Sequence, residues 1–553
     1  MTDQPATRPV RDWRDGVVYQ VYPRSFADHD GNGTGDLAGL IDHLDHFSRE
    51  NLPVDAIWLS PIFPSPGRDL GYDVSDHASV DPLLGSEADF DRLVAACHER
   101  GLKVILDLVM NHTSDEHAWF VASKASRDGP FADFYLWRDP RGFDAHGNPI
   151  PPNNWVSFFG GPGWEWVPER QQFYYHTFLV GQPELNWRNP AVETAQWTMV
   201  RGWLARGVDG FRLDVFNAFL KDPELRDNPV VDGDSAWSRL EHRHDLNHAD
   251  FTDLIGRFRA ILDEHDGRMS VGELFSGGTE TAASYTLDRH LVFDWSLIES
   301  SWTAASFSAA IERREAAYGP DRWPTIALSN HDRERQATRL AASVGRDREP
   351  DRDAIAKAAA VLVLALRGTP FLYYGEEIGM TDVEIPRDEI VDPPALRVGP
   401  GFAWYDRSRC RTPMQWRPGP GGGFTTGHPW LRLAADADRR NVANQTADPD
   451  SVLATYRRLL AFRASEAALR TGRMTLLGSP DPDVLAWTRM TENRRLLVVV
   501  NFAAAPRHVD VGGLLAGHWA GRVGTHRQPA TTGADGILVL RPDEAVILEP
   551  VAD

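Results

Sequence analysis

The fold class of this chain is decided by the stretch DFDRLVAACHERGLKVILDLVMNH at residues 89–112. Residues 89–101 carry apolar side chains at helical spacing, and residues 103–112 open with an apolar run rich in β-branched side chains and leucine. The stretch therefore predicts a helix that leads directly into a buried strand. Residues 54–61, VDAIWLSP, predict an earlier strand. Two buried strands joined through a helix indicate a parallel sheet.

The same alternation of strands and helices extends in both directions along the chain. Strands are predicted by apolar runs at 16–23, 54–61, 103–112, 208–215, 269–275, 325–330 and 370–377. Amphipathic stretches such as DAIAKAAAVLVLALRG stand between the later runs. A series of strand and helix units of this kind indicates an α/β protein with a (β/α)₈ TIM barrel.

Two regions break the alternation. Residues 113–180 follow the third predicted strand and are rich in Trp, Pro, Gly and Asn, which predicts an inserted subdomain. Near the end of the chain, short apolar runs such as RRLLVVVNFA and GILVLRP are separated by turn residues, which predicts a C-terminal antiparallel β domain. The expected domains are a barrel of residues 1–112 and 181–468, the inserted subdomain 113–180, and the β domain 469–553.

The composition restricts the class of partner. The 553 residues include 58 Lys and Arg against 79 Asp and Glu, a net charge of −21, whereas a nucleic-acid binder needs a basic surface. The start of the chain has no apolar segment typical of a signal peptide, and no long uncharged apolar run predicts a membrane span. The two cysteines, Cys97 and Cys410, fit a reducing compartment. We therefore expect a soluble, cytoplasmic protein that binds neither nucleic acid nor membrane.

Polar residues just after the predicted strands form the candidate site, because the active site of a (β/α)₈ barrel lies where its strands end. Six groups qualify: Asp107 with Asn111 and His112, Arg212 with Asp214, Glu273, His331 with Asp332, Asp69 with Tyr72 and Asp73, and the Gly-Glu-Glu segment at 375–377. A single carboxylate in such a place can be a structural helix cap. Several carboxylates on one rim repel one another, and this cost indicates a functional requirement.

Asp214 and Glu273 suit the two roles that cleavage of a glycosidic bond requires. One carboxylate must be ionised to attack the sugar carbon, and one acid must be protonated to donate to the leaving oxygen. Arg212 stands two residues before Asp214 on one predicted strand, so both side chains face the same way and the guanidinium is expected to hold Asp214 ionised. Glu273 follows an apolar run, and crowding by other carboxylates should raise its pKa.

Four short segments resemble the conserved regions of glycoside hydrolase family 13, the α-amylase family. They are DLVMNH at 107–112, GFRLDV at 210–215, GELF at 272–275 and SNHDRE at 329–334, in the order of the family. The resemblance implies that Asp214 is the nucleophile, Glu273 the proton donor and Asp332 the carboxylate that stabilises the transition state. It also implies that Arg212, His112 and His331 contact the sugar ring.

Further segments resemble the oligo-1,6-glucosidase and α-glucosidase branch of that family: QVYPRSF at 20–26, RDLGYDVSDH at 68–77, QPELNW at 182–187 and CRTPMQW at 410–416. The resemblance implies that Tyr72 stacks on the terminal glucose and that Phe178 lines the same subsite. It also implies that Asp69 and Arg411 pair to close the pocket, and a closed pocket implies exo action on short chains. Glu184 departs from the Asp that is usual in this branch.

Val215, directly after the expected nucleophile, resembles the residue of α-1,6-acting members, although core packing would explain a β-branched residue equally well. We expect a retaining, exo-acting α-glucosidase that hydrolyses α-1,4 or α-1,6 bonds of small neutral α-glucosides. The alternatives are an α-glucosyltransferase, or a sucrose or trehalose type of isomerase, of the same family. A non-catalytic binding subunit is disfavoured because all three carboxylates are present.

Residues 28–36, DHDGNGTGD, place oxygen ligands at alternate positions, as calcium loops do. The loop resembles the first-loop Ca²⁺ site of the branch, and the resemblance implies ligands from Asp28, Asp30, Asn32 and Asp36 and from the carbonyl of Thr34. We expect structural Ca²⁺ or Mg²⁺ there, and no cofactor for the chemistry. The alternative is an Asp, Asn and Gly turn without metal.

Three histidines, His242, His244 and His248, lie in the segment EHRHDLNHAD, which has no HExxH zinc pattern. A solvated loop is therefore expected there in place of a metal site, and contact with an acceptor sugar is expected only if the loop overhangs the pocket. Neither Cys97 nor Cys410 is accompanied by a paired His, so neither is expected to act in catalysis.

Overall fold

The computed structural model describes residues 13–287, 290–392, 395–396 and 406–551. Its centre is an eight-stranded sheet in the order β11-β10-β9-β3-β2-β1-β13-β12, with every adjacent pair parallel. The strands are β1 Val18–Val21, β2 Ala56–Leu59, β3 Lys103–Leu108, β9 Gly210–Leu213, β10 Met269–Gly272, β11 His290–Val292, β12 Thr325–Ile326 and β13 Thr369–Tyr373. The Thr325 hydroxyl donates to the Val292 carbonyl at 3.0 Å, which joins the two outer strands and brings the sheet round into a barrel.

The barrel confirms the predicted fold class. Each of the seven apolar runs that predicted a strand overlaps one, although the strands are shorter than the runs. The eighth strand, β11, was not predicted. It is only three residues long and begins with His290, so it lacks the apolar length that identifies a strand in a sequence.

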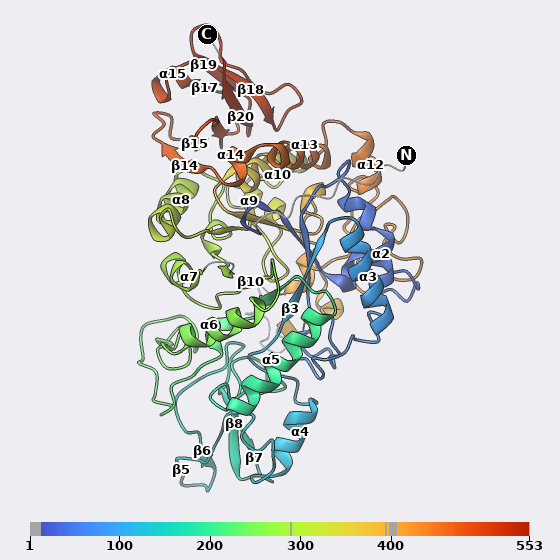
Figure 1. Cartoon of the computed structure of the whole chain (residues 1–553), viewed down its shortest axis with the longest axis vertical. Coiled ribbons are helices and arrows are strands. Elements are labelled where there is room, and N and C mark those ends of the chain that lie inside the picture. Colours follow the sequence, from blue (N-terminus) through green and yellow to red (C-terminus); the bar gives the residue numbers. More distant parts are fainter. Residues whose placement is uncertain (1–12, 288–289, 393–394, 397–405, 552–553) are drawn as a thin grey trace.

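The helices lie outside the strands (Figure 1). The longer ones are α3 Glu87–Glu99, α5 Pro190–Ala205, α6 Phe251–Leu262, α8 Ala304–Tyr318, α10 Glu349–Ala365 and α13 Val452–Ser465, and shorter ones are α2 Leu37–Asp42, α7 Thr279–Tyr285 and α9 Gln336–Ala342. None of the helices in the described ranges is long and apolar enough to cross a membrane.

Helix α3 shows how the sequence sets these elements. Ser86 and Asp89 form a reciprocal capping box at its start, which satisfies backbone N–H groups that a helix leaves unpaired. Phe90, Leu93, Val94 and Cys97 are buried on one face at helical spacing. Gly101, at φ 69°, allows the chain to turn into β3 just after the helix.

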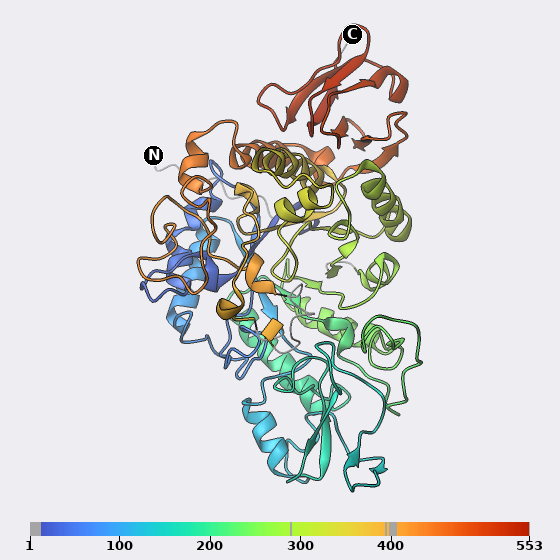
Figure 2. The same cartoon turned by 180° about the vertical axis from the view of Figure 1, so that it is seen from behind.

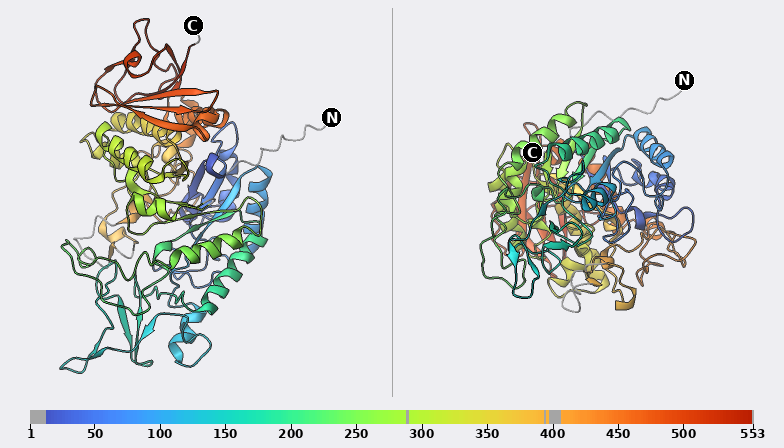
Figure 3. Two further views of the ribbon diagram at one scale, coloured as in Figure 1. Left: turned by 60° about the vertical axis from the view of Figure 1, so that its left-hand side comes forward. Right: turned by 90° about the horizontal axis from the view of Figure 1, so that it is seen from below.

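The inserted subdomain lies between β3 and α5. It contains α4 Ala118–Ala125, a three-stranded sheet of β4 Trp137–Arg138, β8 Gln172–Tyr175 and β7 Trp164–Val167, and a small hairpin of β5 Gly142–Phe143 and β6 Pro149–Ile150. Its Trp-rich composition has a structural reason: Trp155, Trp164, Phe173 and Tyr175 pack into a small core of their own. The subdomain lies at one end of the molecule (Figures 1 and 3).

The C-terminal part is an antiparallel sheet at the opposite end of the molecule (Figures 2 and 3). Its order is β14 Arg473–Leu477, β15 Val484–Met490, β16 Arg495–Asn501, β20 Ala545–Pro550 and β18 Trp519–Gly524, and β17 Arg507–Asp510 pairs separately with β19 Ile537–Leu540. This confirms the predicted C-terminal β domain.

Candidate active site

A cavity of about 470 Å³ opens where the barrel strands end. Asp214 follows β9, Glu273 follows β10, and Asp332 comes from the loop after β12. Eight of the residues that the sequence indicated line this cavity: Asp69, Tyr72, His112, Phe178, Asp214, Val215, Glu273 and Asp332. The parallel barrel thus brings together side chains that are far apart in the sequence.

Arg212 connects the carboxylates at the centre of the cavity. Its Nη1 lies 2.7 Å from Asp214 Oδ1 and 2.6 Å from Asp107 Oδ1, and its Nη2 contacts the carboxylate of Glu273. Arg212 and Asp214 face the same way because they are two residues apart along an extended strand. Only 1% of the Arg212 side chain is exposed, so it acts from behind the cavity lining.

Burial controls the protonation of the two central carboxyl groups. It raises the pKa of Glu273 to about 8 and the pKa of Asp214 to about 7, and Arg212 opposes both shifts. Arg212 therefore favours ionised Asp214, as expected, but burial outweighs it. The negative charge of Asp214 also raises the pKa of Glu273. The two groups therefore titrate as a coupled pair near neutral pH.

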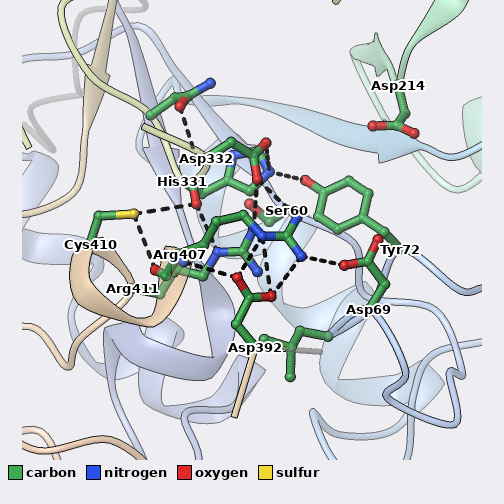
Figure 4. Close-up of polar contacts among 12 residues, drawn as sticks. Ser60, Asp69, Tyr72, Asp214, His331, Asp332, Asp392, Arg407, Cys410 and Arg411 are labelled. Carbon is green, nitrogen blue, oxygen red and sulfur yellow. Dashed lines mark hydrogen bonds and ion pairs between the residues drawn. The ribbon is translucent and has the colours of Figure 1, made fainter. Parts of the chain in front are cut away.

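Asp332 is in the opposite electrostatic situation. Burial disfavours its ionised form, but the neighbouring His331, Arg411 and Arg407 outweigh burial and lower the pKa of this carboxyl well below its usual value. The closest contacts are Arg411 Nη2 at 2.7 Å, His331 Nε2 at 3.0 Å and Arg407 Nη1 at 3.2 Å (Figure 4). Asp332 is thus a permanently ionised group beside a pair that titrates near neutral pH.

Tyr72 lines the cavity, and His331 is fully buried beside it. Their rings stack at 5.3 Å with an interplanar angle of 10°, and the Tyr72 hydroxyl lies 2.9 Å from Asp107 Oδ2. Gln20 Nε2 donates to His331 Nδ1 at 2.8 Å, which leaves the ring proton on Nε2, whose hydrogen-bond partner is the Tyr72 hydroxyl. Burial lowers the pKa of His331 well below its usual value, in agreement with a neutral ring.

The expected pairing of Asp69 with Arg411 is wrong. Asp69 contacts Arg407, whose guanidinium also binds Asp392 at 2.8 Å (Figure 4). Arg411 is fully buried, donates to the carbonyl of His331 at 2.7 Å, and does not line the cavity. Arg407 is the first residue of the short helix Arg407–Cys410, and Arg411 is its C-cap, about one turn later. Arg407 therefore reaches the pocket, whereas Arg411 lies beneath it.

Two other expected residues, His112 and Phe178, lie where the barrel meets the inserted subdomain. His112 Nε2 lies 3.0 Å from the Tyr72 carbonyl, and the Phe178 ring lies 5.4 Å from the His112 ring. Glu184 lies outside the cavity lining and is 1% exposed. Its side chain, longer than that of the usual Asp, reaches Lys221 Nζ at 2.7 Å and forms a buried ion pair behind the site.

Some strand-end candidates do not reach the cavity. Glu376 accepts hydrogen bonds from the Ser329 and Tyr456 hydroxyls, and Glu377 accepts one from Tyr19, so both are buried structural groups. Asp73 accepts the backbone N–H of Asp69 at 2.9 Å and thereby holds the loop that carries Asp69.

The loop at residues 28–36 brings three carboxylates together. One oxygen from each of Asp28, Asp30 and Asp36 lies within 4.8 Å of the others. These oxygens also accept backbone hydrogen bonds; for example, Asp36 accepts from Gly39 as the N-cap of α2. Asn32 Oδ1 accepts from Thr34 N at 2.8 Å, so the expected ligands share one loop structure. An all-oxygen donor set fits a hard cation such as Ca²⁺ or Mg²⁺.

Sequence reasoning missed part of the cavity lining, namely Phe158, Phe159, Trp237, Phe275, Trp295, Glu299, Asn330, Arg333 and Arg407. Asn330 and Arg333 belong to the quoted segment SNHDRE, and their position beside Asp332 was an available signal. Phe158 and Trp237 lie in loops without periodicity, where no pattern relates a residue to the site.

Comparison with known proteins places this site in a family. Residues 20–472 match the family described as alpha amylase, catalytic domain. A probable alpha-glucosidase of Rhizobium meliloti is 40% identical over 511 residues, 90% of each chain, and an oligo-1,6-glucosidase of Heyndrickxia coagulans is 35% identical over 89% of this chain and 92% of its own.

Among solved structures, an alpha-glucosyl transfer enzyme superposes with a TM-score of 0.90 at 40% identity and covers 98% of this chain and 99% of its own. The match extends over the barrel, the inserted subdomain and the C-terminal sheet. The family match therefore includes every element that positions Asp214, Glu273 and Asp332. With this barrel and these carboxylates, the chain belongs to the α-amylase family, glycoside hydrolase family 13.

Proposed function

We propose that the chain is a retaining α-glucosidase that removes terminal, non-reducing α-glucosyl residues from short oligosaccharides. The observation that carries the proposal is the contact of Asp214 and Glu273 with one guanidinium at the centre of the cavity. Two carboxyl groups on one arginine are close together, and retaining glycosidases need a separation of about 5 Å. The ion pairs of Arg407 with Asp69 and Asp392 support a pocket that is closed beyond the terminal sugar.

The reaction takes place in two displacements. An oxygen of Asp214 attacks the anomeric carbon and forms a covalent β-glucosyl ester, while Glu273 gives its proton to the departing oxygen. Glu273 then accepts a proton from water, the water oxygen bonds to the anomeric carbon, and Asp214 leaves. Two inversions release α-glucose. Arg212 contacts both carboxylates, so it counters the negative charge that either one carries during the cycle.

The remaining groups bind the sugar. Asp332 stays ionised throughout and stabilises the positive charge that develops on the ring. Tyr72 presents its ring to the glucose, and its orientation is fixed by the contacts of its hydroxyl with Asp107 and His331. His112 and Phe178 line the same end of the pocket.

The pH dependence of kcat/KM should be bell-shaped, with its maximum between about pH 7 and pH 8. Activity needs Asp214 ionised and Glu273 protonated, so it falls below the Asp214 pKa of about 7 and above the Glu273 pKa of about 8. The measurement is kcat/KM for maltose from about pH 5 to about pH 10, with circular dichroism at each pH as a control for folding. A flat profile over this range would contradict the assignment.

A substrate panel tests the activity itself. Maltose, isomaltose, sucrose, trehalose and starch are incubated separately, and the first product is observed by proton NMR. We expect α-glucose from the short substrates and little product from starch, because the pocket admits only a chain end. Initial β-glucose would exclude a retaining mechanism, and rapid cleavage inside starch would exclude exo action.

The linkage preference depends on the position of Val215. This residue lines the pocket, packs with Phe159 and Phe178, and has a left-handed backbone with φ 36°. Left-handed geometry costs energy for a β-branched side chain, and such strain is found mainly at functional sites. We propose that Val215 contacts the bond to be cleaved and admits α-1,6 as well as α-1,4 linkages. The isomaltose and maltose rates of the panel measure this.

Transfer of glucose to an acceptor other than water is the second candidate. Its support is the 40% identity to a solved alpha-glucosyl transfer enzyme. The covalent intermediate is the same, and only the acceptor in the second displacement differs. Transfer products that increase with sugar concentration in the panel would identify this activity.

We propose that the loop at residues 28–36 binds Ca²⁺ or Mg²⁺ through Asp28, Asp30, Asn32 and Asp36 and the Thr34 carbonyl. The ion would join this loop to the start of α2 and have no part in the reaction. Removal by a chelator should lower the melting temperature by about 5 °C, because the ion binds the folded chain alone. The variant Asp30→Asn should respond less to the chelator. An unchanged melting temperature in the parent protein would contradict metal binding.

The two cysteines support a cytoplasmic location. Cys97 and Cys410 are buried thiols without a disulfide bond. Burial raises the pKa of Cys97 to about 12, so this thiol is unreactive. Reduced cysteines are usual in the cytosol, and we propose that the enzyme acts there.

A further inference from the structure

The loop between β9 and α6 brings an unassigned tryptophan to the cavity. Its chain folds back on itself, since Val231 N donates to the Arg239 carbonyl at 2.8 Å and Glu241 N donates to the Pro229 carbonyl at 2.9 Å. Trp237 lies within this fold and lines the cavity. The loop continues into the segment with the three histidines, so the two features belong to one structural unit.

Trp237 forms an aromatic wall with Phe158 and Phe275. The ring centroids lie 5.5 Å apart for Phe158 and Trp237, 5.7 Å for Trp237 and Phe275, and 5.0 Å for Phe158 and Phe275, all with edge-to-face geometry. The three rings come from the inserted subdomain, the β9–α6 loop and the β10–α7 loop. Mutual edge-to-face packing of rings from separate segments makes a defined apolar surface.

The wall lies on the side of the cavity where the leaving group must be. Phe275 packs on Phe178 at 5.0 Å, and Phe178 packs on His112 at the glucose-binding end. The wall therefore extends outward from the glucose and past the bond to be cleaved. Glu299, Asn330 and Arg333 also line the cavity, so its lining combines this aromatic surface with polar side chains.

His242 fixes the orientation of Trp237. The two rings stack with centroids 3.6 Å apart and an interplanar angle of 23°. His242 Nδ1 lies 2.8 Å from Asp245 Oδ2, and its Nε2 lies 3.1 Å from the Trp237 carbonyl oxygen. Both ring nitrogens are therefore in contact, and the imidazole cannot rotate without loss of a hydrogen bond.

Asp245 in turn anchors this unit to the inserted subdomain. Its side chain is 1% exposed and accepts from Asn228 Nδ2 at 2.9 Å. The Asn228 carbonyl accepts from Asn154 Nδ2 at 2.8 Å, and Asn154 precedes the part of the chain that carries Phe158. The same hydrogen bonds thus hold Trp237 and the segment of Phe158 in one fixed relation.

We propose that Trp237, Phe158 and Phe275 bind the planar ring of an aryl aglycone, with His242 and Asp245 as positioning residues for Trp237. The inference rests on the proposed α-glucosidase activity and names its preferred substrate class as aryl α-glucosides. A second sugar carries hydroxyl groups around its rim, and the hydrocarbon rings of Phe158 and Phe275 offer these groups no hydrogen bond. An aryl ring can stack on, or pack edge-to-face against, each of these three aromatic side chains.

The first test compares wild type and Trp237→Ala on three substrates: 4-nitrophenyl α-glucoside, maltose and α-glucosyl fluoride. We expect kcat/KM to fall by about tenfold or more for the aryl glucoside, because one stacking face is removed. The loss should be smaller for maltose and smallest for the fluoride, whose leaving group has no ring. Phe143→Ala, at an exposed phenylalanine of the inserted subdomain, is the control.

Equal losses on the three substrates would overturn the inference, and so would a loss on maltose as large as that on the aryl glucoside. Inactivity of the wild type on α-glucosyl fluoride would instead remove the proposed function. The two failures are therefore distinguishable.

The second test examines His242. We expect His242→Ala to raise KM for the aryl glucoside with little change in kcat, and the double variant with Trp237→Ala to be no worse than Trp237→Ala alone. His244→Ala, on the same loop, is the control. Additive losses in the double variant would show that His242 does not act through Trp237.

Discussion

Replacing Asp214 by Asn lowers kcat/KM for maltose by on the order of 10⁵-fold, because an amide cannot form the glycosyl ester. Folding should be preserved. Burial raises the pKa of Asp214 above its value in an unfolded chain, so above that unfolded value the ionised group costs folding free energy. Its neutral replacement therefore removes a cost, and the melting temperature should stay the same or rise.

The measurement combines steady-state kinetics with thermal unfolding of the purified variant. Asp144→Asn, an exposed carboxylate in a turn of the inserted subdomain, makes the same chemical change away from the site and serves as the control. Retention of more than a hundredth of the wild-type rate by the Asp214 variant would exclude it as the nucleophile.

Glu273→Gln should produce a loss that depends on the leaving group. For maltose the expected decrease in kcat/KM is on the order of 10³-fold, since the departing sugar oxygen then receives no proton. For α-glucosyl fluoride the decrease in the first displacement should be much smaller, because fluoride leaves without protonation. The alkaline decrease in activity should also disappear, since the amide does not ionise near the Glu273 pKa of about 8.

Reaction with azide shows whether the Glu273 variant has lost only its acid and base group or has a damaged active site. In the Glu273 variant, azide needs no general base, so it attacks the covalent intermediate, displaces Asp214 and gives α-glucosyl azide. The wild type should form little of this product. Equal losses for maltose and the fluoride, with no azide product, would contradict the role of Glu273.

The sequence alone predicted the barrel because most of its strands are apolar runs next to amphipathic helices. Strand β11 was missed because His290, Leu291 and Val292 make too short a run, and its parallel pairing with β10 defines it instead. The catalytic carboxylates were predictable for a related reason. Asp214 and Glu273 directly follow their strands, so their place at the rim depends on local structure.

The partners of those residues were less predictable. Asp69 and Arg407 belong to loops 338 residues apart, and no periodic pattern decides between Arg407 and Arg411. Trp237 lies in a loop whose path is set by side-chain hydrogen bonds such as that between His242 and Asp245. The choice of contact depends on tertiary packing of irregular backbone, which local propensity does not encode.

The long separation of Asp69 from Arg407 has a consequence for the timing of synthesis. At about 5–20 residues per second, a ribosome needs roughly 20–70 s to add the 338 residues between them. Asp214, Glu273 and Asp332 are added in turn during that interval, all before the arginine that contacts Asp69 and Asp332. The part of the cavity lining that Arg407 provides can therefore form only after the last barrel strand, β13, has been synthesised.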